Sequence, residues 1–188
     1  MANNDSVIRL LFVEDRLDDA EQLISILRNG GIAVRPHRPE SLDDLAAMLK
    51  EQSIDLVLAN HAAKAIPFAQ VLAAVESSGK DVPVVATVNS ITEEVELAAV
   101  AAGARGVAVR SKANRLQHVV RDEFTALDQR RSLRRLESAL RDAERRCDAL
   151  IASSRDPIAY VHEGMHIRAN PAYLEMFGYE SWEEVEGL

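Results

Sequence analysis

Residues 7–23 read VIRLLFVEDRLDDAEQL, an apolar run that ends at two acidic residues and continues into an amphipathic segment. An almost continuous run of β-branched and aliphatic residues is typical of a parallel strand that is covered on both faces. The apolar residues that follow recur at helical spacing, and Gly30-Gly31 supplies a helix stop. The stretch therefore predicts a strand from Val7 to Val13, an acidic loop and a helix.

The same strand and helix unit recurs four more times along the chain. We expect further strands at 32–35, 54–59, 82–88 and 106–109, each followed by an amphipathic helix. Ser41 is the expected N-cap of the second helix, and Ser90 with Glu93 forms the expected capping box of the fourth. Five successive repeats predict an α/β fold, a doubly wound parallel sheet with helices on both faces.

Composition excludes several classes of protein. The 188 residues carry a formal net charge of −8, which argues against nucleic acid as a partner. The single cysteine, Cys147, excludes an intrachain disulfide framework. The amino terminus lacks the pattern of a secretory signal and no apolar run is long enough to span a membrane, so we expect a cytoplasmic protein.

Four segments of the first 125 residues together resemble the response-regulator receiver family. They are LLFVEDRLDDAEQL (10–23), DLVLAN (55–60), VPVVATV (82–88) and AAGARGVAVRS (101–111). The resemblance implies a flavodoxin-like (βα)5 domain over residues 1–125.

The resemblance also implies a phosphorylation site at the carboxyl edge of the sheet, and here the chain departs from the pattern. Receivers use an acidic pair that holds Mg²⁺, an aspartate nucleophile, a Thr or Ser and a Lys. Glu14 and Asp15 fit the acidic pair, but Asn60, Val88 and Arg110 stand at the other three positions. A carboxamide cannot form an acyl phosphate. We therefore expect a degenerate phosphorylation site with no catalytic residue and no cofactor.

The acidic pair leaves two alternatives open. Glu14 and Asp15 could retain weak Mg²⁺ binding, or Arg110 could form an internal ion pair with one of them. A one-residue shift that brought Thr87 into the site is disfavoured, because it would turn alternate residues of the strand to the wrong faces. Asp55, at the opposite end of its strand, is interpreted as a simple residue at the start of the strand.

A helix of about 40 residues is predicted after Ser111, with Asn114 as its N-cap. Its first third would pack on the sheet. Beyond that, apolar residues alternate by three and four positions, an a/d seam that predicts a parallel homodimer; they are Leu133, Leu136, Leu140, Ala143, Cys147 and Leu150. The alternative is an antiparallel hairpin or a helix that folds back onto a neighbouring domain. We treat residues 113–152 as a coiled-coil linker.

Residues 153–188 change character. Two short strands are predicted around a turn at Glu163-Gly164, followed by a helix that begins at Asn170-Pro171. ANPAYLEMFGY (169–179) and SWEEVEGL (181–188) are similar to the opening of PAS sensor domains. The resemblance implies an incomplete PAS domain of α+β type.

The order of receiver, helix and PAS segment resembles the amino-terminal half of multidomain cyclic-di-GMP proteins that carry GGDEF and EAL domains. The resemblance implies a non-enzymatic signalling module that acts through homodimerisation and protein partners, in a signalling or type IV pilus complex that controls twitching motility. The face around residues 97–104 is a second candidate contact surface. Two alternatives stay open: a receiver that accepts a phosphoryl group on another residue, and a PAS-based small-molecule sensor.

Overall fold

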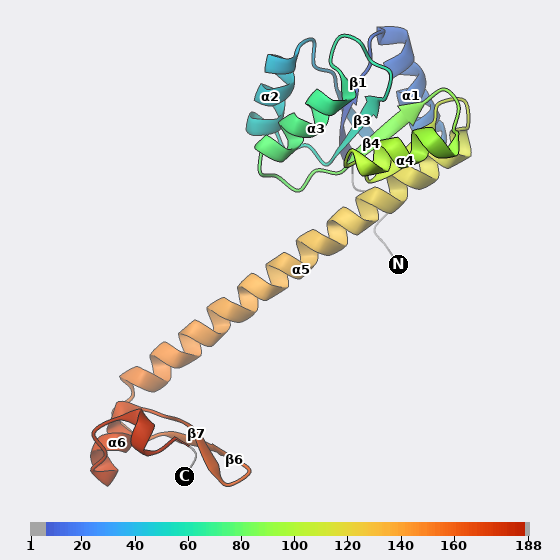
Figure 1. Ribbon diagram of the computed structural model, residues 1–188. Coiled ribbons are helices and arrows are strands. Elements are labelled where there is room, and N and C mark those ends of the chain that lie inside the picture. The colour runs from blue at the N-terminus through green and yellow to red at the C-terminus, as the bar shows by residue number, and fades with distance from the viewer. Residues whose placement is uncertain (1–6, 187–188) are drawn as a thin grey trace. The chain divides into compact units, whose positions relative to one another are not determined.

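The computed structural model describes residues 7–186 and divides the chain into two compact units (Figure 1). Unit 1 ends at Arg131 and unit 2 begins at Ser132, so the boundary falls inside one long helix. Each unit is described separately below.

Unit 1 contains the parallel sheet that the sequence predicts. The strand order β2-β1-β3-β4-β5 is that of flavodoxin-like folds. Every neighbouring pair of strands is parallel, which confirms the doubly wound arrangement. The strands are β1 (Ile8–Val13), β2 (Val34–His37), β3 (Leu56–Asn60), β4 (Val84–Val88) and β5 (Gly106–Val109).

Helices cover both faces of this sheet. The buried side chains of α1 and α5 pack with one face, and those of α2, α3 and α4 pack with the other. Both faces of the sheet are therefore shielded from solvent, as expected for strands made of continuous apolar residues. The helices are α1 (Leu17–Asn29), α2 (Leu42–Glu51), α3 (Phe68–Ser77), α4 (Glu93–Ala101) and α5 (Ala113–Ser153).

Some predicted boundaries are confirmed and others are wrong. Ser41 caps α2, since its hydroxyl accepts a hydrogen bond from the Asp44 amide at 3.2 Å. The predicted capping box of α4 is wrong, because Thr92 is the N-cap and accepts from the Val95 amide at 3.3 Å. Asn114 is not an N-cap, since α5 already begins at Ala113.

The starts of four strands also differ from the prediction. β1 begins at Ile8, one residue later than predicted. β2 begins at Val34 rather than at residue 32, because the Ile32 amide donates to the Leu27 carbonyl and so belongs to the end of α1. β3 and β4 each begin two residues later than predicted. The residues between the predicted and observed starts of β3 and β4 are buried, and all except Asp55 are apolar.

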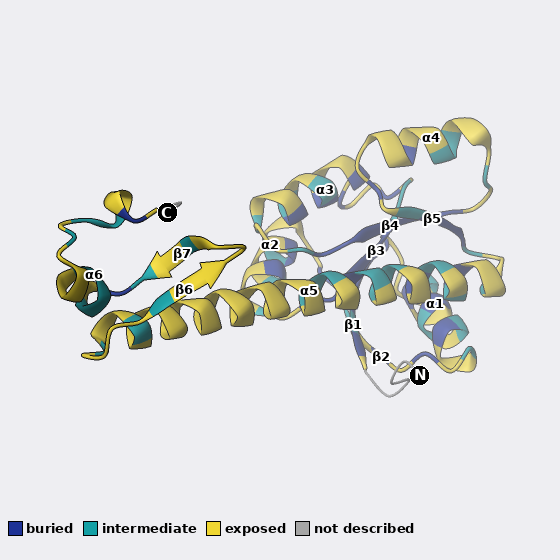
Figure 2. Cartoon of the chain, turned by 90° about the horizontal axis from the view of Figure 1, so that it is seen from below, coloured by how far each residue is buried: buried dark blue, intermediate teal, exposed yellow. Residues whose placement is uncertain are grey.

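α5 is 41 residues long, and its surroundings change along its length. Leu116, Val120 and Leu127 are fully buried in unit 1. From Ser132 to Leu150 every residue is exposed, including all six residues of the predicted seam (Figure 2). None of the helices in the described part of the chain combines the length and apolarity that crossing a membrane requires.

Unit 2 contains a hairpin and a short helix where the sequence predicts them. β6 (Ala159–His162) and β7 (Met165–Ala169) are antiparallel, and Glu163 and Gly164 form the turn with positive φ angles. α6 (Pro171–Phe177) is capped by Asn170, and a 3₁₀ turn at Trp182–Glu184 follows.

Asn170 is the buried polar centre of unit 2. Its Oδ1 accepts hydrogen bonds from the amides of Ile158 and Tyr173, and its Nδ2 donates to the carbonyl of Ile151 at the end of α5. One side chain thus joins the helix end, the hairpin and α6.

Candidate functional site

The structure brings the five candidate residues to one edge of the sheet in unit 1. Glu14 follows β1, Asn60 ends β3, Val88 ends β4, and Arg110 follows β5, so all lie at the carboxyl edge of parallel strands. Ligands and catalytic groups of open α/β sheets gather at this edge. Its chemistry therefore depends on how each side chain is already bonded.

Glu14 is buried and both of its carboxylate oxygens have partners. Arg110 forms an ion pair with Oε2, and the Thr87 hydroxyl donates to Oε1 at 3.1 Å. The Glu14 side chain has no exposed surface. Burial raises the pKa of Glu14, and Arg110 and Thr87 oppose that shift.

Arg110 is therefore held inside the site. Besides Glu14, its guanidinium lies 3.5 Å from Asp19 of α1. Of the two alternatives for the acidic pair, the structure contains the ion pair, and Glu14 rather than Asp15 is the partner.

Asp15 is bonded to the chain itself. Its carboxylate accepts hydrogen bonds from the backbone amides of Lys64, at 3.0 Å, and Ala65, at 2.9 Å. These amides lower the pKa of Asp15, since they favour the ionised form. The carboxylate thus fixes the loop between β3 and α3.

Asn60 and Val88 offer no reactive group. The Asn60 side-chain oxygen accepts from the Ala62 amide at 3.0 Å, a local turn that keeps the carboxamide on its own backbone. Val88 is buried in the core at the end of β4 and has no hydroxyl to offer.

The carboxyl edge fits a divalent cation poorly. Hard cations need about six oxygen ligands, whereas the oxygens of Glu14 and Asp15 are bonded to Arg110, Thr87 and backbone amides. Within residues 7–186, no group of three or more His, Cys, Asp or Glu side chains is arranged to hold a metal ion.

Thr87 contacts Glu14, although the sequence pattern disfavours a place for Thr87 in the site. Its hydroxyl reaches Glu14 without any shift of the strand, and the neighbouring Ala86 and Val88 remain buried. The alternation of side chains along a strand could not exclude this contact. Both faces of the sheet are covered by helices, so an apolar residue can be buried on either face. A hydroxyl within an otherwise apolar strand was the available signal.

Asp55 is not a simple residue at the start of a strand. Its buried carboxylate accepts from the Arg9 side chain at 2.8 Å and from Arg131 of α5 at 2.6 Å. Burial raises the pKa of Asp55, but the hydrogen bonds from Arg9 and Arg131 outweigh it and hold the pKa below its usual value. No local pattern indicated this contact, because Arg131 and Asp55 lie 76 residues apart in the chain.

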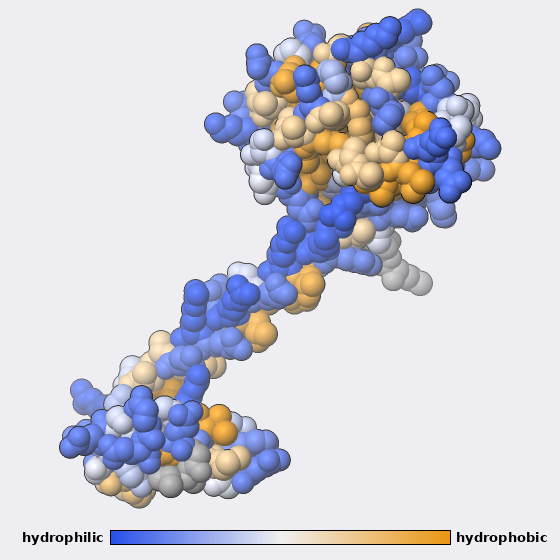
Figure 3. All heavy atoms as spheres, viewed as in Figure 1, coloured by the Kyte–Doolittle hydropathy of each residue, from blue (hydrophilic) through white to orange (hydrophobic). Residues whose placement is uncertain are grey.

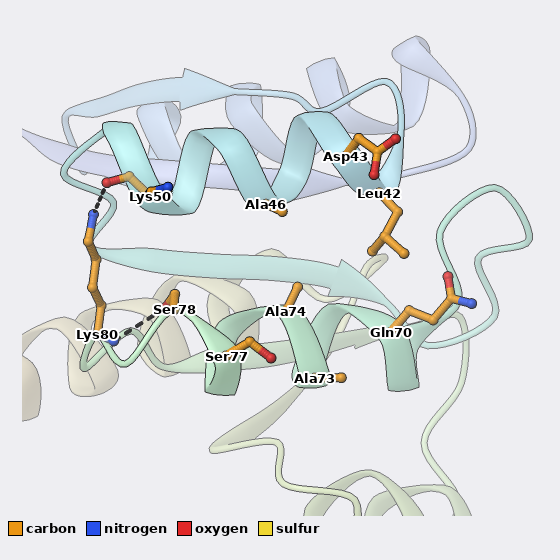
Figure 4. Close-up of a pocket in the computed structure, with 10 residues that line it drawn as sticks. All are labelled: Leu42, Asp43, Ala46, Lys50, Gln70, Ala73, Ala74, Ser77, Ser78 and Lys80. Atoms are coloured by element: carbon orange, nitrogen blue, oxygen red, sulfur yellow. Dashed lines mark hydrogen bonds between the residues drawn. The ribbon is translucent and has the colours of Figure 1, made fainter.

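A groove of about 700 Å³ lies between α2 and α3 (Figure 4). Ala46, Ala73 and Ala74 line its middle, and Lys50 and Lys80 lie at one end. Lys80 donates to the carbonyls of Lys50 and Gln52, so its ammonium caps the end of α2.

α4 presents apolar side chains to solvent. Leu97 and Val100 are 62% and 52% exposed, and Figure 3 shows apolar surface in the region of this helix. The face around residues 97–104 is thus available for contact.

Comparisons with known proteins identify the fold of unit 1. No family model matches the chain, and no curated protein matches it. Among solved structures, it is similar to the receiver domain of a LuxO repressor protein from Vibrio parahaemolyticus, with 14% identity and a TM-score of 0.58 over 68% of this chain and 98% of that one.

Two further solved structures extend this finding. A CheY-like receiver domain from Methanospirillum hungatei has 14% identity and a TM-score of 0.54, over 66% of this chain and 99% of that one. A fusion that carries the trimeric coiled coil of yeast Spc42 has 18% identity and a TM-score of 0.57, over 77% of this chain and 97% of that one. Unit 1 therefore has the fold of response-regulator receiver domains.

Proposed function

We propose that the chain is a non-enzymatic signalling module, in which a receiver-like domain has exchanged phosphorylation for protein contacts. The domain would act by binding partners at its surface and by fixing the direction of α5. The helix would then transmit the orientation of the domain to unit 2. The proposal follows from the chemistry of the carboxyl edge and from the exposed seam of α5.

The observation that carries the proposal is the internal bonding of the two carboxylates at the carboxyl edge, those of Glu14 and Asp15. Asn60 lacks the anionic oxygen of a phosphoryl acceptor. Glu14 is neutralised by Arg110, and Asp15 is bonded to the Lys64 and Ala65 amides. An edge whose charges are paired within the fold supports one fixed state of the domain.

Dimerisation supplies the second part of the proposal. The seam residues Leu133, Leu136, Leu140 and Leu150 are each more than half exposed in the single chain, and a second copy would bury them. One solved neighbour carries a trimeric coiled coil, which supports self-association through such a helix but not the number of copies. The exposed face of α4, with Leu97 and Val100, is the second surface for a copy or a protein partner.

The finer part of the proposal rests on the sequence resemblance. Unit 2 would be the opening of a PAS domain, and the whole would resemble the amino-terminal half of FimX-like proteins with GGDEF and EAL domains. Its role would then be in type IV pilus assembly and twitching motility. The hairpin of β6 and β7, followed by the capped α6, supports the PAS interpretation.

The test is phosphotransfer. The full chain is incubated with acetyl phosphate and Mg²⁺, and its intact mass is measured beside a receiver that has all five site residues. We expect the control protein to gain a phosphoryl group and this chain to gain none. A stoichiometric mass gain on this chain would overturn the proposal, and peptide mapping would then name the accepting residue.

A further inference from the structure

Arg130 and Arg131 are the last two residues of unit 1, and both are bonded to carboxylates. Arg131 pairs with Asp55 at 2.6 Å, and Arg130 pairs with Asp81 through two hydrogen bonds of 3.0 Å. Asp55 precedes β3 and Asp81 precedes β4, so both carboxylates lie at the amino edge of the sheet, opposite the degenerate site.

Asp55 is built as an anchor. Its side chain is 3% exposed, and it accepts from the backbone amide and guanidinium of Arg9 as well as from Arg131. A buried carboxylate with two arginines is costly to leave half paired. The Arg9 contact fixes the carboxylate on β1, and the Arg131 contact then joins α5 to it.

These ionic contacts lie beyond the apolar packing of α5. The last fully buried side chain of the helix is Leu127, and the exposed seam begins at Leu133. Arg130 and Arg131 therefore attach about one further turn of helix, ~6 Å of its length. No buried apolar side chain of α5 helps them there.

We propose that Asp55 and Asp81 form a latch that holds α5 at the point where it leaves unit 1, and that this latch sets how the seam is presented. The inference deepens the proposed function and rests on it, since it names the contact through which the domain controls its helix. The latch consists of ion pairs whose arginines are partly exposed, so it can open without unfolding the core. A contact made by buried apolar side chains could not open in this way.

Hydrogen exchange on the full chain tests the latch. We expect Arg130→Gln with Arg131→Gln to accelerate amide exchange of residues 128–132 about tenfold, because the charge-assisted hydrogen bonds that hold this turn of α5 to Asp55 and Asp81 are lost. Amides around Leu116 and Val120 should keep their protection, and Arg130→Lys with Arg131→Lys should recover most of the lost protection.

A matched control removes two exposed arginines further along the helix, Arg135→Gln with Arg141→Gln, and should leave the exchange of residues 128–132 unchanged. Unchanged exchange in the latch variant would overturn the proposal, and so would equal acceleration around Leu116 and Val120, which would mean that the pairs stabilise the whole domain. Repeating the measurement with Leu136→Asp and Leu140→Asp, which remove the seam, separates failure of the latch from failure of dimerisation.

Discussion

The two halves of α5 have similar apolar spacing but opposite surroundings. In the first half Leu116, Val120 and Leu127 are fully buried against the sheet, whereas in the second half Leu136 and Leu150 are 69% and 71% exposed. The same kind of amphipathic pattern is thus satisfied inside one chain and left uncovered a few turns later. The difference shows that periodicity predicts an apolar face, while the partner of that face depends on what else the chain supplies.

The largest expected effect is on the uncovered half. Leu136→Asp with Leu140→Asp places two charges in the seam and should weaken self-association at least about a thousandfold, because each carboxylate would have to be buried without a partner. Light scattering or sedimentation should then show a monomer at concentrations at which the parent chain is a dimer.

The matched control for this variant is Ser138→Asp with Arg145→Gln, which changes the charge by the same amount on the opposite face of the heptad. It should leave the dimer intact. An unchanged dimer in the seam variant would contradict the coiled coil and would direct the search to the face of α4.

A substitution in the covered half of α5 should change the stability of unit 1 and leave self-association unchanged. Leu127→Ala removes a fully buried side chain and should lower the free energy of unfolding of unit 1 by about 3 kcal/mol. Urea unfolding measures this loss, and the molecular mass in solution should not change. A loss below about 1 kcal/mol would show that Leu127 is not part of a packed core.

A smaller effect is expected at Gly106 of β5, where the side chain of Val119 from α5 lies close to the strand. A Cβ at Gly106 would lie 2.9 Å from Cγ1 of Val119, so Gly106→Ala should destabilise unit 1 by about 1–2 kcal/mol. Val119→Ala makes room for the added methyl group. The double variant should therefore lose less free energy of unfolding than the two single variants lose together. A loss equal to the sum of the single losses would argue against the contact.

The smallest effect is the pH dependence at the boundary between the halves. The pKa of Asp55 is lowered in the folded state, so its ionised form stabilises the fold above the ordinary pKa of about 4. That stability is lost as the pH falls through the folded value. The urea midpoint of the parent chain should exceed that of Asp55→Asn by less than about 1 M near neutral pH. The difference between the two urea midpoints should become smaller below about pH 4. A difference that does not change with pH would contradict a lowered pKa of Asp55.

Much of unit 1 could be predicted from the sequence, because buried parallel strands and helix stops leave strong local signals. The order of elements belongs to this part, and so does the placement at the carboxyl edge of Glu14, Asn60, Val88 and Arg110. The missed contacts of Thr87 and Asp55 have a common physical cause, since each joins residues far apart in the chain. Thr87 bonds to Glu14 and Arg131 bonds to Asp55, and neither partner is near in sequence.

The local errors have a different cause. Ser90 and Thr92 are both good capping residues, and the choice between them depends on where the chain leaves β4. The seam of α5 stays a prediction, because the surface that would cover it belongs to a second copy of the chain.

The closed carboxyl edge also has a consequence in time. A covalent phosphoryl group has a lifetime that hydrolysis determines, so a receiver that carries one has a built-in clock. In the proposed function Glu14 stays bonded to Arg110 and Thr87 and Asn60 accepts no phosphoryl group, so this edge would have no such reaction to time a signal. Under the proposed function, the duration of a response would equal the residence time of the bound partner, which single residues at the contact surface can tune through the dissociation rate.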